Sequence, residues 1–128
     1  MTKSDWLDLT VLERKKYGYL SEVMDLSQQL GEALDRNDQV SVQMLVAMRQ
    51  EPILHLQELK QAFSSRAALL TSEEQARVSA LGRGAEPQGE EETLYHTQAG
   101  IARRLLERVL ELDKRLNRRM TGDSSFYK

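Results

Sequence analysis

Two histidines, His55 and His96, carry the side chains in this sequence that could act in acid–base catalysis or bind a metal. His55 lies near Gln57 and Glu58, and His96 stands within the stretch Tyr95-His96-Thr97-Gln98. Neither histidine shares an obvious helix face with a second histidine or with a carboxylate, which a helical metal site would need. We therefore interpret both as partly exposed structural residues.

No other stretch of the sequence has the spacing of a catalytic or nucleotide-binding motif. Gly82-Arg83-Gly84 lacks both the lysine and the preceding strand that a phosphate-binding loop needs. Glu90-Glu91-Glu92 is interpreted as acidic charge at a helix N-terminus, where the helix dipole favours it, rather than as a calcium or magnesium site. The absence of cysteine excludes disulfides, thiolate zinc sites and thiol catalysis. The sequence predicts no enzyme, no catalytic residue, no metal site and no cofactor.

The composition indicates a globular chain of about one domain, because 40% of its 128 residues are hydrophobic and 30% are charged. Eighteen basic residues against twenty acidic ones give a net charge of -2, which argues against a nucleic-acid-binding face. No apolar run reaches the ~18 residues of a membrane span. Residues 1–6 do not resemble a signal peptide. We expect a cytoplasmic protein without membrane insertion.

Apolar residues recur at three- and four-residue steps, which predicts an all-α fold. The first helix is expected over residues 5–34 with Ser4 as its cap, and a break near Gly18 stays open. Residues 35–38 form a polar link in which Asp38 is a suitable N-cap for a second helix. Pro52 is expected to kink that helix, and a division into two helices is the alternative.

A short helix is expected from a capping box of Ser72 with Gln75, followed by a loop at about residues 82–89. The last helix is expected to end before Gly122. Residues 1–122 then form a single helical-bundle domain, and residues 123–128 form a flexible C-terminal tail. The predicted architecture is an elongated antiparallel bundle of three long helices with one short extra helix.

The last helix carries more apolar surface than a three-helix bundle needs. One seam holds Leu94, Ile101, Leu105, Leu112 and Leu116, and a second holds Tyr95, Ala102, Leu106 and Leu110. Since one broad stripe is enough to pack a helix into such a bundle, the second predicts self-association or a protein partner. Methionines 24, 44, 48 and 120 either fill gaps in the core or contribute to a binding surface. The predicted partner-binding residues are Leu106, Leu110, Leu116, Met120, Phe126 and Tyr127.

Two segments of the chain resemble a known family. The first runs from Tyr19-Leu20 through Leu34-Asp35-Arg36-Asn37-Asp38 to Val42, Leu45-Val46, Arg49-Gln50, Ile53 and Leu56. The second holds Ile101, Leu105, Val109-Leu110, Leu112-Asp113 and Leu116, with Ser125-Phe126-Tyr127 after it. Both are similar to small flagellar type III export chaperones of the FlgN/FliT type.

The resemblance implies a cytosolic chaperone in flagellum biogenesis. It would hold amphipathic helical segments of hook-associated or filament-cap proteins before secretion. The alternative is a structural or regulatory coiled-coil bundle that acts by homo-oligomerisation, for example as a homodimer.

Overall fold

The computed structural model describes the backbone of residues 1–125 and the side chains of residues 1–121, in which four helices and no strand are present. The helices make up 87% of the described residues, so the predicted all-α class is confirmed. They are α1 (Lys3–Asp35), α2 (Gln39–Ala67), α3 (Ser72–Gly82) and α4 (Glu90–Ser125). Three are long and one is short, as the sequence predicts.

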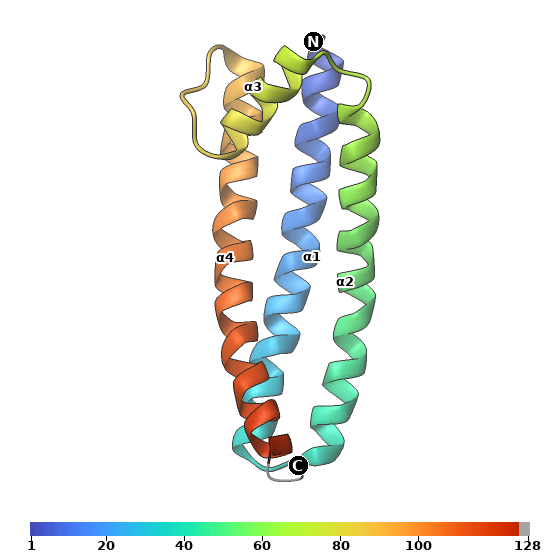
Figure 1. Ribbon diagram of the computed structural model, residues 1–128, viewed down its shortest axis with the longest axis vertical. Coiled ribbons are helices and arrows are strands. Elements are labelled where there is room, and N and C mark those ends of the chain that lie inside the picture. The colour runs from blue at the N-terminus through green and yellow to red at the C-terminus, as the bar shows by residue number, and fades with distance from the viewer. Residues whose placement is uncertain (126–128) are drawn as a thin grey trace.

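The long helices lie side by side in an elongated bundle, with α1 in the middle (Figure 1). α2 runs antiparallel to α1, and α4 runs parallel to α1, because α3 and its loop turn the chain at the end where α2 finishes. α1 packs along both α2 and α4, whereas α2 and α4 have no comparable interface within residues 1–125. Two long helices therefore stand next to each other across the face of a third.

The first two helices begin and end where local capping chemistry places them. Thr2, not Ser4, caps α1, and its hydroxyl oxygen accepts from the Asp5 amide at 3.1 Å while the Asp5 carboxylate accepts from the Thr2 amide. α1 continues through Gly18 without a break. Asp38 caps α2 as predicted, accepting from the Ser41 amide at 3.1 Å. α2 also stays whole through Pro52.

The limits of the last two helices differ from those predicted. Thr71 with Glu74, rather than Ser72 with Gln75, forms the capping box of α3, one residue earlier. α4 continues through Gly122 to Ser125, whereas the sequence predicts an end before Gly122. Glycine costs a helix interior only about 1 kcal/mol relative to alanine, and it ends a helix only where the chain adopts the left-handed conformation.

Three hydrophobic clusters follow one another along the bundle. The first, at the α3 end, contains Trp6, Leu9, Val78, Leu81, Tyr95 and Ala99. The middle cluster contains Leu20, Val23, Leu105 and Val109. The last, beside the α1–α2 turn, contains Leu30, Ala33, Val42, Leu45 and Leu116. α1 contributes to all three clusters, which is why it occupies the centre.

The assignment of α4 to two seams was partly wrong. Tyr95 and Ala102, placed on the second seam, are 2% and 0% exposed, whereas Leu94 of the first seam is 57% exposed. The first cluster explains the burial of Tyr95, which packs with Val78 and Leu81 of α3 and lies 5.7 Å from Trp6 between ring centroids. α3 therefore buries part of the surplus apolar surface of α4.

Candidate helix-binding groove

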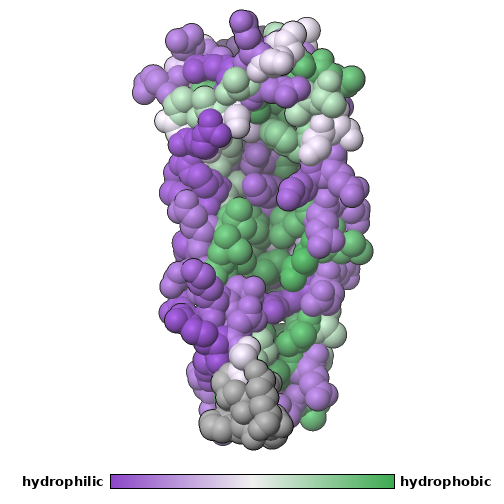
Figure 2. Space-filling view, viewed as in Figure 1, coloured by the Kyte–Doolittle hydropathy of each residue, from purple (hydrophilic) through white to green (hydrophobic). Residues whose placement is uncertain are grey.

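An open groove lies between α2 and α4, and α1 forms its floor. Two adjoining hollows of about 420 and 520 Å³ mark it. Figure 2 shows hydrophobic side chains along the middle of this face, with hydrophilic side chains on both sides. The groove exists because α2 and α4 both pack on α1 without packing closely on each other.

Apolar side chains from all four helices line the two hollows. The floor residues on α1 extend from Leu9 to Leu20, which corresponds to about 17 Å at 1.5 Å per residue. The walls are formed by Leu56, Leu59, Phe63 and Ala67 of α2, Val78 of α3, and Tyr95, Ala99 and Leu106 of α4. Three turns of a helix have this length, so the groove matches a short amphipathic helix in size.

Glu13 and Lys16 are the two charged residues of the floor on α1, and Glu13 is buried. It is 8% exposed, its Oε2 has no hydrogen-bond partner among the described residues, and its Oε1 lies 3.5 Å from the Tyr95 hydroxyl. Burial raises the pKa of Glu13, and the charge of Lys16 partly opposes that rise. Burial and the Glu13 carboxylate also raise the pKa of Tyr95, so the Tyr95 hydroxyl remains a proton donor at neutral pH.

A polar bridge between α2 and α4 lies beyond the lower end of the groove. Arg49 of α2 donates through Nη1 to Asp113 Oδ1 of α4 at 2.7 Å and to Ser27 Oγ of α1 at 3.0 Å. The Arg49 side chain is 9% exposed, so its aliphatic part is buried among all three long helices. This bridge fixes the separation of α2 and α4 at one end.

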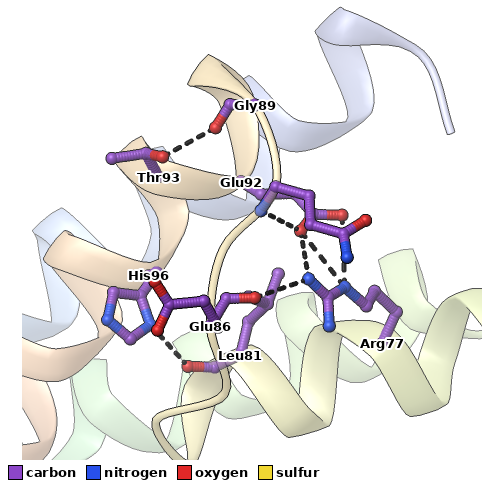
Figure 3. A network of polar contacts seen from close by, with 8 residues as sticks. Arg77, Leu81, Glu86, Gly89, Glu92, Thr93 and His96 are labelled. Atoms are coloured by element: carbon purple, nitrogen blue, oxygen red, sulfur yellow. Dashed lines mark hydrogen bonds and ion pairs between the residues drawn. The ribbon is translucent and has the colours of Figure 1, made fainter.

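At the opposite end of the groove, hydrogen bonds and an ion pair connect α3 and the loop after it to α4 (Figure 3). Arg77 of α3 donates from Nε to both carboxylate oxygens of Glu92 at 3.1 and 3.2 Å, and from Nη2 to the Glu86 carbonyl at 2.8 Å. Arg77 lowers the pKa of Glu92, since its charge and hydrogen bonds favour the carboxylate. Gly84 and Gly89 turn the loop with φ values of 109° and 87°, which favour glycine.

The predicted partner-binding residues do not form one surface. Leu106 lines both hollows, and Leu110 is 54% exposed. Leu116 is 2% exposed in the last core cluster, and Met120 packs against that cluster, so neither offers an open surface. Phe126 and Tyr127 lie outside the described residues.

Leu106 and Leu110 share a face of α4 that points toward α2. Leu106, Leu110 and Asp113 stand at i, i+4 and i+7, which places them on one side of a helix. The contact of Asp113 with Arg49 directs that side to α2. Of the predicted set, Leu106 therefore lines the groove, and Leu110 continues the same face of α4 outside the two hollows.

The histidines lie away from the groove lining. His55 stacks on Tyr19 at 4.8 Å between ring centroids, and its ring nitrogens lie 3.8 and 3.7 Å from carboxylate oxygens of Glu51 and Glu58. His55 therefore shares a helix face with carboxylates at i−4 and i+3, contrary to the expectation from the sequence. His96 Nδ1 lies 3.3 Å from the Leu81 carbonyl oxygen. No group of three or more His, Cys, Asp or Glu side chains in residues described by the structure is placed to hold a metal ion.

None of the helices in residues 1–125 combines the length and the apolar character that crossing a bilayer requires. Comparison with known proteins finds no matching family model, no matching curated protein and no matching solved structure.

Proposed function

We propose that this protein is a non-enzymatic binding module that holds an amphipathic helix of another protein in the groove between α2 and α4. The observation that carries the proposal is the groove itself, an apolar channel three helical turns long with α1 as its floor. Helix-in-groove recognition uses such channels. The bound helix places its apolar stripe, at positions i, i+3, i+4 and i+7, against apolar side chains of the groove that no helix of the chain covers.

The resemblance to flagellar export chaperones gives this proposal a biological role. A chaperone of this kind would keep the helical terminal segments of hook-associated or filament-cap proteins unassembled in the cytoplasm until type III export. Neighbouring genes for hook, filament or export components would support this role. Titration of such terminal segments from the source organism into the protein tests it directly, and no heat of binding at micromolar concentrations would contradict it.

The helix-binding activity is tested with a probe that does not depend on the partner's identity. The probe is a fluorescein-labelled synthetic helix with leucines at i, i+3, i+4 and i+7 and glutamine at its flanking positions, followed by fluorescence anisotropy. We expect Leu106→Ala with Leu110→Ala to weaken its binding by about tenfold or more, since each buried leucine contributes roughly 1.5–3 kcal/mol before ordering costs.

A matched control separates groove contacts from general hydrophobicity. Leu54 of α2 and Leu110 of α4 are both 54% exposed and line neither hollow, but Leu110 lies on the α4 face that also carries the groove residue Leu106. Leu110→Ala should therefore weaken probe binding more than Leu54→Ala, with unchanged circular dichroism in both variants. Equal effects would show that the groove is not the binding surface.

A second candidate function, self-association, is favoured by a separate apolar stripe on α2. Val40, Met44 and Met48 stand at i, i+4 and i+8 and are 79%, 54% and 48% exposed. If a second copy of the chain covers this stripe, the two copies form a homodimer that acts as a scaffold. Sedimentation velocity of the protein and of Met44→Glu tests this, and a monomer in both samples at micromolar concentrations would reject it.

A further inference from the structure

The groove carries positive charge on its floor and on both walls. Lys16 of α1, Lys60 of α2 and Arg103 of α4 line it, one cation from each long helix. No ion pair joins any of the three to a carboxylate among the side chains of residues 1–121. Arg103 donates to the Gly82 carbonyl at 2.5 Å, which holds its guanidinium at the α4 wall without neutralising it.

Glu13 is the one carboxylate among the residues that line the two hollows. It can offset one of the three positive charges. Its side chain is buried in the floor, and Lys16 is the cation that acts on it. Glu107 of α4 belongs to a different hollow, on the side of α4 where Met24 and Arg108 lie. Lys60 and Arg103 therefore remain as uncompensated charges on opposite walls.

We propose that the occupant of the groove is an acidic amphipathic helix, with carboxylates on both edges of its apolar stripe. This inference rests on the helix-binding function proposed above and specifies the chemistry of the partner. The apolar stripe packs on the leucines of the floor and walls. The flanking Asp or Glu side chains then reach Lys60 on one wall and Arg103 on the other, which sets the orientation of the helix and speeds its encounter.

The helices α1 and α4 of a second copy of the chain fit poorly as the occupant. The most basic segment of α4, residues 103–119, carries seven basic and three acidic residues, so its own groove cations would repel it. α1 is enclosed by its neighbours, and its apolar face is already packed against α2 and α4. A partner helix of opposite charge is the occupant that both the shape and the charge of the groove accept.

The test compares three synthetic helices that share one leucine stripe and differ only at the flanking positions, which hold glutamate, glutamine or lysine. Each is titrated into the full-length protein at low and at high salt and followed by fluorescence anisotropy. We expect the glutamate helix to bind about tenfold more tightly than the lysine helix at low salt, since each partly exposed ion pair contributes only a few-fold in affinity. The difference should shrink as salt increases.

Charge reversal on one wall tests the assignment to the groove. Lys60→Glu should reduce or reverse the preference for the glutamate helix, whereas Lys15→Glu, the same change at an exposed α1 residue that lines neither hollow, should leave it unchanged. Equal effects of the two variants would overturn the assignment to the groove.

The two proposals fail in different ways. If all three helices bind equally, the acidic partner is rejected while helix binding stands. If the lysine helix binds best, the acidic partner is also rejected, and Glu13 is then the groove residue that attracts the partner's charge. If none of the three helices binds, helix binding itself is rejected.

Discussion

Arg49 of α2 donates a 2.7 Å hydrogen bond to Asp113 of α4, 64 residues along the chain, across helices that otherwise have no extensive interface. The same guanidinium nitrogen donates to Ser27 of α1, so one side chain connects all three long helices. The Arg49 Nε is buried and has no hydrogen-bond partner among the described residues, which makes Arg49 sensitive to the loss of its carboxylate.

Removing the carboxylate should therefore cost more than removing the charge of Arg49. We expect Asp113→Ala to lower the free energy of unfolding by about 1–3 kcal/mol, a range reduced from that of a fully buried pair because Asp113 is 38% exposed. Arg49→Met removes the charge and keeps the packing volume, and it should cost about 1 kcal/mol or less. Urea denaturation of both variants and of the double variant measures this. A larger loss for Arg49→Met would contradict it.

The buried carboxylate of Glu13 should make the protein less stable at neutral pH than at mildly acidic pH. Its pKa is raised in the folded state, so the folded state binds the proton more tightly than the unfolded chain. That contribution to stability is present below the usual glutamate pKa and is lost as the pH rises through the folded pKa. We expect Glu13→Gln to raise the free energy of unfolding at pH 7 and to flatten its change with pH in this window.

Thermal denaturation between pH 4 and pH 7 measures the effect. Glu22→Gln, an exposed change on the same helix, is the control and should leave the pH dependence as it is. A fall in stability of Glu13→Gln at pH 7 would show that the carboxylate accepts a hydrogen bond that the amide cannot replace.

The sequence predicts the helices better than it predicts the groove. Apolar spacing is a local signal, so the four helices, the Asp38 cap and the continuity of α2 through Pro52 agree with the structure. The groove depends on which helices touch, and nothing in the spacing indicates that α1 takes the middle position. The sequence also does not indicate that α3 covers Tyr95. For this reason the predicted division of α4 into two seams was partly wrong.

One local signal for the groove was present and was missed. Glu13 stands at i+4 from Leu9 and at i−7 from Leu20, within the apolar stripe of α1. A charged residue at a stripe position indicates either a buried polar contact or a gap in the packing above it. Here both hold, because Glu13 approaches Tyr95 and lines both hollows.

The loop between α3 and α4 should depend on Arg77. Arg77 connects α3 to Glu92 of α4 and to the Glu86 carbonyl in the loop (Figure 3), so its removal frees both attachments. We expect Arg77→Ala to increase the rate of limited proteolysis in residues 83–89 while the helical circular dichroism is retained. The pKa of Glu92 should rise toward its usual value, because Arg77 is the main cause of its depression. Arg83→Ala is the control, because Arg83 also lies near the loop and has no carboxylate at ion-pair distance among the side chains of residues 1–121.

Two leucines five residues apart on α4 should separate folding from binding. Leu105 is 8% exposed in the middle core cluster, whereas Leu110 is 54% exposed on the face turned toward α2. Leu105→Ala should lower the free energy of unfolding by about 2–5 kcal/mol, since it leaves a cavity among packed side chains. Leu110→Ala should change it by less than about 0.5 kcal/mol, since it removes few contacts of the folded chain.

Urea denaturation followed by circular dichroism gives both values, and the m-values should stay unchanged. If Leu110→Ala destabilises the protein as much as Leu105→Ala does, then Leu110 is part of the core, and α4 presents no free apolar edge to a partner. If its stability is retained while its affinity for the leucine-stripe helix falls, the groove side of α4 serves binding rather than folding.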